Sequence, residues 1–335
     1  MNSLERCLAV LNGEETDRVP VFPLMMFFAA DRIGVNYRRY VTESEVIAEA
    51  QFNLYENYYL DCLTVCSDAF RVSADAGAEM EFPENGTPFA VRPLIKTRED
   101  LKAAKRPDPM KQGGRMRNRV DTVEKLAKSK GEEALIMGWV EMPFAEACDW
   151  CHLSDFMTLL YDDPELAHDI LDFLTEIEID FALAQLDAGA HIIGCGDAAA
   201  SLISKDAFRE FALPYEQRIT AAIKEAGGMS KLHICGNTNH ILEDMASNGS
   251  DLYNIDHMVD FAESARVYSA AGKAFKGNVD PVSDLLQATP EEAEAAALRC
   301  IKIAEGKRYM LSAGCEIPAA TQDETYFAFA KSVMK

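Results

Sequence analysis

Three side chains that bind soft metal ions stand at two distant places in the chain. His233 and Cys235 lie in the segment KLHICGNT, and Cys315 lies much later in MLSAGCEIP. On a regular strand the first two side chains point to the same side, because side chains alternate between the faces. One imidazole and two thiolates form a zinc ligand set, and three protein ligands with an open fourth position are typical of a catalytic zinc ion.

Asp256, which ends the segment YNID, is our candidate for a fourth ligand that holds the metal at rest and leaves when a substrate arrives. The alternative is that His233 is a core histidine and both cysteines are buried apolar residues. That explanation would be preferred for an isolated His-x-Cys pair. The third cysteine, which lies between Gly314 and Pro318 at the end of another apolar run, favours the metal site.

The remaining cysteines are weaker candidates. The chain has nine, and an odd number in a long chain argues against a disulfide framework. Cys148 and Cys151 form a rival metal or redox motif, but the surrounding sequence is helical and has no second pair, so we expect both to be buried. Cys195, in IIGCGDAAAS, is a candidate for lining a substrate pocket, although burial is the simpler explanation.

Carboxylates follow three of the apolar runs and are candidates for catalysis. Asp68, Glu141 and Asp197 each lie at the end of such a run, where they could bond a substrate hydroxyl or transfer a proton. The alternative for each is a loop or helix cap. Near the start of the chain, the apolar side chains Met25, Met26, Phe27 and Phe28 are candidates for a pocket that holds an aromatic ring, with plain core packing as the alternative.

The elements that must position these residues are short apolar runs separated by amphipathic helical stretches. Eight such runs are found, at 19–22, 61–66, 134–140, 191–196, 230–235, 252–256, 274–278 and 308–313. Helices are expected at 43–59, 164–188, 205–226, 237–248 and 289–305. This alternation predicts parallel strands covered on both faces, and eight strands indicate a (β/α)8 TIM barrel, in which the strand ends meet at one rim.

Two further features complete the predicted architecture. A helical extension precedes the first run. The turn sequence PENGTP predicts a β-hairpin within 71–95, and 97–130 is charged and helical. We therefore expect one domain over residues 1–335 with a rim insertion at 71–130.

Charge and composition exclude several classes of function. The formal net charge is −22, from 55 acidic and 33 basic residues, so the surface repels nucleic acid and anionic membranes. The N-terminal segment does not have the pattern of a signal peptide, and no apolar run is long enough to span a membrane. We expect a cytoplasmic protein that acts on a small molecule. The oligomeric state is left open, a homodimer included.

Several segments resemble the zinc-dependent corrinoid methyltransferases of the uroporphyrinogen decarboxylase superfamily. They are LHICGNTNHILEDMASNGSD, NID, GNVDP and SAGCEIPAATQDET, with RVPVFPLMM and DAGAHIIGCGDAAAS nearer the N-terminus. The resemblance implies the TIM-barrel fold and zinc ligands at His233, Cys235 and Cys315, with Asp256 where a carboxylate completes the resting site. It also implies a cobamide, which a separate corrinoid protein must carry because this sequence lacks the D-x-H-x-x-G cobalt-ligand signature.

The same resemblance suggests the direction of transfer. Residues 315–318 read Cys-Glu-Ile-Pro where the coenzyme M branch has Cys-Gly-Ile, and VEMPFAEACD resembles the aryl-ether demethylating branch. The hypothesis is therefore O-demethylation of a methoxylated aromatic, with the methyl group passing to the cobalt of the partner. The alternatives are a methylcobamide:thiol methyltransferase, a metal-free decarboxylase of the same superfamily, and a non-catalytic scaffold with a structural zinc.

Overall fold

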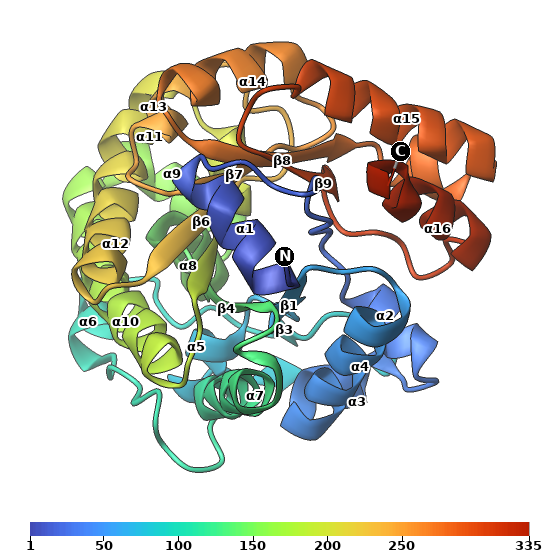
Figure 1. Cartoon of the computed structure of the whole chain (residues 1–335). Coiled ribbons are helices and arrows are strands. Elements are labelled where there is room, and N and C mark those ends of the chain that lie inside the picture. The colour runs from blue at the N-terminus through green and yellow to red at the C-terminus, as the bar shows by residue number, and fades with distance from the viewer. Residues whose placement is uncertain (335) are drawn as a thin grey trace.

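The computed structural model describes residues 1–334 and is built around one curled parallel sheet. Seven strands follow one another around it in the order β1-β4-β5-β6-β7-β8-β9, with helices on the outside (Figure 1). The strands are β1 Cys62–Thr64, β4 Leu135–Glu141, β5 Ile192–Gly196, β6 Met229–His233, β7 Leu252–Asn254, β8 Ala274–Val279 and β9 Tyr309–Ala313. Each lies within or close to a predicted apolar run.

The eighth run closes the barrel without forming a full strand. Val21 makes an isolated parallel bridge to Leu311, and Phe22 N–H donates to the Leu311 carbonyl at 2.8 Å. On the other side, Asp61 N–H donates to the Val21 carbonyl at 2.9 Å, just before β1. Pro20 and Pro23 flank this contact and have no N–H to donate, so pairing cannot extend. The predicted TIM-barrel class is confirmed, with the predicted strand at 19–22 reduced to a bridge.

Helix α1 lies across the N-terminal end of the barrel. Asn2 and Glu5 form a capping box that starts the helix, and Gly13 ends it in a left-handed conformation with φ 77°. The Leu4 N–H donates to the Glu133 carbonyl at 2.8 Å and ties the helix to the approach to β4. In Figure 1 this helix crosses the centre of the ring, so the predicted N-terminal extension is confirmed and covers the end opposite the expected site.

The remaining helices surround the sheet and the two ends of the barrel. They are α1 Ser3–Asn12, α2 Phe27–Arg32, α3 Tyr37–Thr42, α4 Ser44–Asn57, α5 Arg71–Asp75, α6 Arg98–Ala103, α7 Arg115–Lys130, α8 Pro143–Cys151, α9 Leu153–Asp162, α10 Pro164–Asp187, α11 Lys205–Phe211, α12 Leu213–Glu225, α13 Leu242–Ala246, α14 Phe261–Ala270, α15 Pro290–Ile303 and α16 Asp323–Lys331, with short 3-10 or π turns η1 Ala198–Leu202, η2 Val282–Leu286 and η3 Ser332–Met334. Among residues 1–334, no helix combines the length and the apolar character that a membrane crossing requires.

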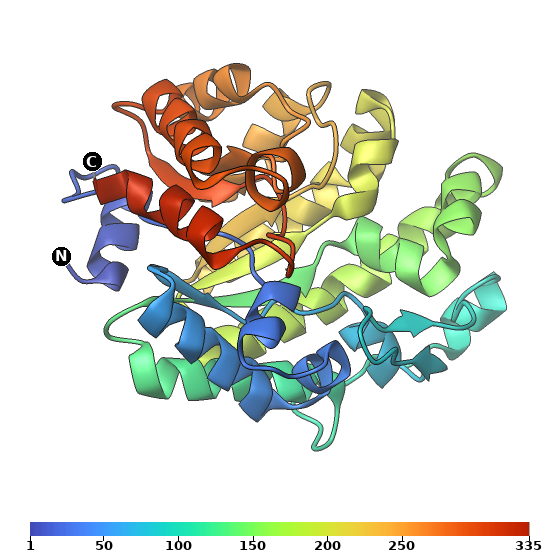
Figure 2. The same cartoon turned by 90° about the vertical axis from the view of Figure 1, so that its right-hand side faces the viewer.

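The inserted segment forms the predicted hairpin. Strand β2 (Met80–Glu81) pairs antiparallel with β3 (Phe89–Ala90), as the turn sequence between them predicts. In Figure 2 the hairpin and α1 lie at opposite ends of the molecule. The predicted helical stretch at 97–130 is interrupted between α6 and α7, because Pro107, Pro109 and two glycines fall there.

Two predicted helices differ from the structure. The stretch 205–226 is divided into α11 and α12 at Ala212, since Pro214 in the first turn of α12 cannot donate to the preceding turn. The stretch 237–248 is helical only over α13, because its start is a polar turn rich in asparagine. Cys148 and Cys151 are buried in α8, as expected from their helical surroundings.

Candidate metal centre and rim pocket

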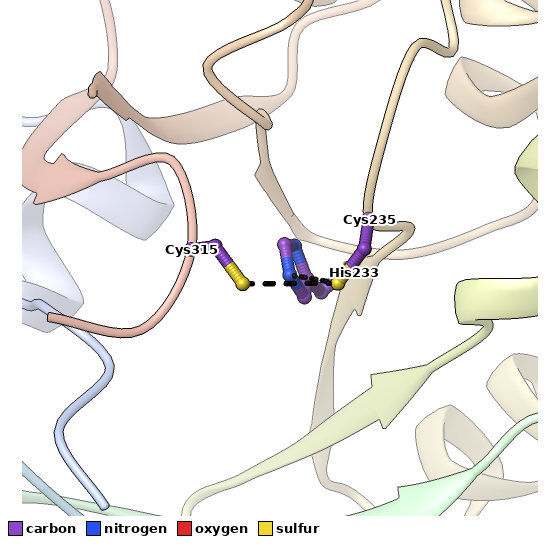
Figure 3. Close-up of side chains that lie close together, drawn as sticks. All are labelled: His233, Cys235 and Cys315. Carbon is purple, nitrogen blue, oxygen red and sulfur yellow. Dashed lines mark hydrogen bonds between the residues drawn. The ribbon is translucent and has the colours of Figure 1, made fainter. Parts of the chain in front are cut away.

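His233, Cys235 and Cys315 come together at the C-terminal rim of the barrel (Figure 3). We call them the metal-capable group. His233 ends β6, Cys235 follows it by two residues, and Cys315 lies two residues after β9. Their ligand atoms all lie within 4.8 Å of one another, and they form the one such group found over residues 1–334. The predicted convergence of two barrel strands on one point is therefore what the fold produces.

The separation of the two sulfurs fits a tetrahedral zinc ion. The two sulfurs are 3.8 Å apart, and the Cys235 sulfur is 3.0 Å from His233 Nε2. Two sulfurs bound to zinc at ~2.3 Å each with a tetrahedral angle are separated by about 3.8 Å. The observed sulfur separation therefore suits zinc without any movement of the two cysteines, and the donor set suits it chemically.

The orientation of the His233 ring leaves the right nitrogen free. Nδ1 lies 3.3 Å from the carbonyl oxygen of Asn254, so Nδ1–H donates to that oxygen and Nε2 keeps its lone pair toward the cysteines. Asn254 in turn donates from its side chain to the Gly314 carbonyl at 3.3 Å. One residue of β7 therefore holds both the histidine and the loop that carries Cys315, as partners behind metal ligands do.

The two thiols of the group titrate as a pair. Contact with Cys235 lowers the pKa of Cys315, and the same contact raises the pKa of Cys235, because one proton is shared between two sulfurs. Nearby His233 adds to the lowering at Cys315. A group that already stabilises one thiolate is suited to a metal ion, which binds thiolates in place of protons.

A glycine allows the Cys315 loop to approach the loop after β7. A Cβ on Gly314 would lie 2.2 Å from the backbone nitrogen of His257 and 2.9 Å from the carbonyl carbon of Asp256. No larger residue fits at that position without moving backbone. The close approach places Cys315 opposite Cys235.

Asp256 lies near this group but outside it. It is buried, and its Oδ1 accepts a hydrogen bond from the Met258 N–H at 2.9 Å and lies 3.2 Å from His257 Nδ1. It is not among the residues whose ligand atoms converge. Its role as a fourth ligand remains a prediction, and would require its carboxylate to turn away from these partners.

Glu141 stands at the end of β4, two strands away from His233 around the rim. Its Oε1 accepts a hydrogen bond of 2.6 Å from Trp139 Nε1. Burial raises the pKa of Glu141 to about 7, while the bond from Trp139 acts in the opposite direction. A carboxyl group that titrates near neutrality can both give and take a proton at the working pH.

Glu141 and His233 belong to one row of the sheet. Gly196 of β5 pairs with Glu141 on one side and with His233 on the other. A Cβ on Gly196 would lie 2.6 Å from Glu141 Oε2, so the carboxylate extends over the glycine toward β6. Neighbouring strands are about 4.8 Å apart, and the absence of a side chain on the middle residue brings the carboxylate toward the histidine.

The other two predicted catalytic carboxylates are engaged elsewhere. Asp68 is buried, with salt bridges to Arg115 at 2.8 Å and to Arg71 at 3.4 Å. Burial opposes its ionisation, but these arginines and Arg119 outweigh that cost and hold its pKa at about 2. Both oxygens are occupied by Arg115, so the carboxylate organises the rim insertion instead of facing a substrate.

Asp197 is fully buried against the helices. Burial raises its pKa well above the ordinary value, and the nearby carboxyl of Glu216 on α12 raises it further. Glu216 accepts from Asn248 Nδ2 at 2.9 Å and is buried as well. Asp197 therefore forms a buried acid pair with Glu216 beneath the rim, and its side chain is not exposed to solvent.

Two of the four predicted pocket residues near the N-terminus pack into the core. Met25 and Phe28 are buried, and the Phe28 ring contacts Tyr58 and Tyr326 at centroid distances of 5.5 Å. The ring of Phe28 is enclosed by Tyr58, directly after α4, and by Tyr326 of α16. Because Met25 and Phe28 are both buried, their positions do not agree with a role in lining a pocket.

Met26 and Phe27, which lie between those two residues, are partly exposed, and a carboxylate binds their backbone N–H groups. The backbone N–H groups of Met26 and Phe27 donate to Glu316 Oε1 at 3.1 and 2.6 Å, and the Phe27 ring stacks on Tyr37. Glu316, next to Cys315, is a residue that sequence reasoning did not single out for this role. It fastens the start of α2 to the metal-bearing loop.

Cys195 points away from the barrel interior. A Cβ on Gly194 would meet the Trp139 ring, and one on Gly196 would meet Glu141, so both glycines face inward. Cys195 lies between them on the strand and therefore faces the helices, where it is fully buried. The prediction that it lines a pocket does not agree with this position.

A pocket that the sequence did not reveal opens beside Glu141. It has a volume of about 710 Å³ and lies between the hairpin insertion, α8, the start of α9 and η1. We call it the rim pocket. Apolar side chains dominate its lining, among them Phe70, Ala145, Leu153, Ala199 and Leu202. These residues come from four separate segments, and no local pattern connects them.

Two buried lysines inside the barrel were also not predicted. Lys231 and Lys276 are fully or almost fully buried, and Lys276 Nζ donates to the Phe22 carbonyl at 2.6 Å. Lys231 Nζ lies 4.6 Å from the centre of the Trp139 ring, and burial lowers its pKa to about 8. The sequence could have indicated the position of Lys231, because it lies two residues before His233 on the same strand and its side chain therefore points to the same side.

Comparison with known proteins gives matches along nearly the whole chain. The Uroporphyrinogen decarboxylase (URO-D) family matches residues 2–335. The methylcobamide:CoM methyltransferase MtaA of Methanosarcina barkeri is 28% identical over 330 residues, which cover 94% of this chain and 93% of that protein. A uroporphyrinogen decarboxylase of a Synechococcus species is 26% identical over 354 residues, covering 99% and 97%. The solved structure of a methyltransferase from Methanosarcina mazei superposes with a TM-score of 0.90 at 26% identity, covering 100% and 98%.

Proposed function

The chain belongs to the uroporphyrinogen decarboxylase (URO-D) family, and on that premise we propose that it is a zinc-dependent methyltransferase. It moves a methyl group between a small substrate and the cobalt of a cobamide that a separate corrinoid protein carries. Relatives named methylcobamide:CoM methyltransferases and the Methanosarcina mazei structure support corrinoid-dependent methyl transfer. In this proposal residues 1–335 act as a single domain, with 71–130 as an insertion on its rim.

The observation that carries the proposal is the convergence of one histidine and two cysteines at the open end of the barrel. His233, Cys235 and Cys315 would hold the zinc ion, and Asp256 would close the fourth position until a substrate arrives. Bound there, zinc supplies a Lewis acid that lowers the pKa of a substrate thiol or stabilises negative charge on a departing oxygen. Three protein ligands at a barrel rim are a catalytic pattern, whereas a purely structural zinc has four.

The substrate we favour is a methoxylated aromatic, which the protein would demethylate at oxygen. The carbon–oxygen bond of the ether breaks as a carbon–cobalt bond forms with an electron pair from cobalt(I). The released oxygen keeps the pair of the broken bond and takes up one proton. Glu141 is suited to manage that proton, because its pKa is about 7 and its carboxylate extends toward His233. The apolar rim pocket beside it supports an aromatic substrate.

A methylcobamide:thiol methyltransferase is the second candidate, and the names of the relatives favour it. The same metal-capable group would then bind a thiol, and the methyl group would pass from cobalt to sulfur. A metal-free decarboxylase is the third candidate, since decarboxylases of the family match over a similar length. Decarboxylation of a substrate with several carboxylates needs cationic side chains, and the rim pocket, as far as the structure describes it, contains no lysine or arginine.

Zinc analysis and two half-reactions test the proposal. The purified chain should contain about one zinc per molecule by plasma mass spectrometry, and the variants His233→Ala, Cys235→Ser and Cys315→Ser should lose it. Cob(I)alamin with methoxyphenols measures demethylation, and methylcobalamin with thiols measures the alternative, both followed by the cobalamin spectrum.

The matched control is Cys7→Ala, which removes a buried thiol on α1, at the end of the barrel opposite the metal-capable group. It should keep its zinc and its activity. Absence of zinc from the wild-type protein, or full zinc in all three ligand variants, would overturn the proposal and favour the decarboxylase.

A further inference from the structure

The rim pocket has two acidic side chains on an otherwise apolar lining. Its ionisable residues are Glu141, Asp149 and His152. Asp149 is half-buried and makes no hydrogen bond or ion pair with any residue in 1–334. Burial raises the pKa of Asp149 well above its ordinary value, and the neighbouring Glu141 raises it further. Two carboxyl groups therefore face a cavity whose single basic lining residue is an exposed histidine.

Arg119 and Lys231, whose charges act on Glu141, are not among the residues that line the pocket. Arg119 is buried and donates to the carbonyl oxygens of Trp139 and Asp68 at 3.2 and 2.7 Å. Lys231 is enclosed in the barrel with its ammonium over the Trp139 ring. A carboxylate or sulfonate in the pocket would lose its water and meet two acidic groups, with no lysine or arginine in the lining to pair with it. A hydroxyl, by contrast, can donate to Glu141.

The pocket adjoins the metal-capable group through shared walls. Glu141 lines the pocket, and its Oε2 lies over Gly196 in the row that ends at His233. Turn η1 supplies pocket residues, and its Ser201 Oγ lies 3.1 Å from where a Cβ on Gly236 would stand, directly after Cys235. A ring in the pocket therefore has Glu141 on the side that leads to the metal.

We propose that the rim pocket selects uncharged phenolic methyl ethers, with a free ring hydroxyl donating to Glu141, and rejects substrates that bear a carboxylate or a sulfonate. The volume of about 710 Å³ is within the range for small-molecule sites and holds a single aromatic ring with substituents. This inference rests on the proposed function, since it specifies which methyl donor the same site accepts. The same selectivity argues against methylation of the thiol 2-mercaptoethanesulfonate, because that molecule carries a sulfonate.

Direct binding tests the selectivity without a methyl transfer step. Four probes are titrated into the zinc-loaded full chain by calorimetry: 2-methoxyphenol, methoxybenzene, 4-hydroxy-3-methoxybenzoate and 2-mercaptoethanesulfonate. We expect 2-methoxyphenol to bind at least about 10-fold more tightly than methoxybenzene, which has no hydroxyl, and than the benzoate, which adds one charge. Because Trp139 is bonded to Glu141, tryptophan fluorescence should change with the phenol.

Two variants assign the effect to named groups. Glu141→Gln keeps the size of the side chain but loses the charged acceptor, so the preference for the hydroxyl should fall about 10-fold. Asp149→Asn should improve binding of the benzoate more than that of 2-methoxyphenol, and most at high pH, where Asp149 is ionised in the wild-type protein. Glu165→Gln, at an exposed acid on α10, is the matched control and should change neither. Circular dichroism and the melting temperature establish that each variant is folded.

The outcomes separate this inference from the proposed function. Equal or tighter binding of the benzoate or the sulfonate to the wild-type protein overturns the selectivity, whatever the zinc content. Selective phenol binding that Glu141→Gln leaves intact also overturns it, because another group then reads the hydroxyl. A protein without zinc that still prefers the phenol supports the inference about the pocket and removes the methyl transfer.

Discussion

Gly314→Ala tests how closely the fold positions the metal-capable group. The added methyl would stand 2.2 Å from the backbone nitrogen of His257. Ordinary contact begins at 3.4 Å, so the two loops must separate by the difference between 3.4 Å and 2.2 Å, about 1.2 Å. The atoms that the added methyl would meet are backbone atoms of Asp256 and His257, so no flexible side chain can move aside to make room.

That displacement is large compared with what a zinc site tolerates. Metal–ligand distances hold within about ±0.2 Å, so a shift of the Cys315 loop by about six times that amount should remove its sulfur from the coordination sphere. We expect zinc affinity to fall at least about 100-fold, since even changes behind the ligands cost 10- to 100-fold. Strain of this kind lowers the free energy of unfolding by about 1–3 kcal/mol.

The assay is competition for zinc with a chromogenic chelator, together with chemical denaturation of the same samples. Gly306→Ala is the matched control, because Gly306 has φ +70° and no atom within 4 Å of the added methyl. It should lose about 1 kcal/mol of stability through backbone strain alone and keep its zinc. If Gly314→Ala binds zinc as tightly as the wild type, the geometric argument is wrong and Cys315 is not a ligand.

Three further predictions concern the residues around the site. Burial raises the pKa of Glu216 from 4.5 to about 7, so the folded protein favours the protonated form and its stability falls as pH rises from about 4.5 to 7. Glu216→Gln should remove that slope in pH-dependent denaturation and add about 3 kcal/mol of stability at pH 8. An unchanged slope would contradict the buried pair with Asp197. Arg115→Ala should cost about 3–5 kcal/mol in urea denaturation, because it leaves the charge of Asp68 buried and short of a partner; a loss below 1 kcal/mol would show the pair to be dispensable. Cys195→Ala should leave zinc content and the KM for a methoxyphenol unchanged, because that side chain faces the helices, and a raised KM would return it to the pocket.

The local sequence was enough to predict the class of fold and the metal-capable residues. Parallel strands buried on both faces appear as short apolar runs, and the helices between them have their own periodicity and caps, so the barrel could be inferred from local patterns. His233 and Cys235 share a strand face by spacing alone, and the end of the last run supplies Cys315. All C-terminal strand ends of a barrel meet at one rim, which makes the convergence a consequence of topology.

The roles of single carboxylates and apolar residues were decided by packing across the chain. Asp68 and Glu141 look alike in the sequence, since both follow an apolar run. Arginines from α5 and α7 neutralise the first, and a glycine on the next strand leaves room for the second to extend toward the rim. Phe28 is in the core because Tyr58, directly after α4, and Tyr326 of α16 pack against its ring.

The sequence by itself therefore determined which elements form and where the sulfur and imidazole ligands stand along them. Only the tertiary structure decided which carboxylate remains free, which cysteine faces outward and where a substrate pocket opens. The physical reason is that periodicity and capping are read within a few residues, whereas burial, ion pairing and empty space depend on side chains that arrive from distant segments. The rim pocket, assembled from the insertion, α8, α9 and η1, is the clearest case.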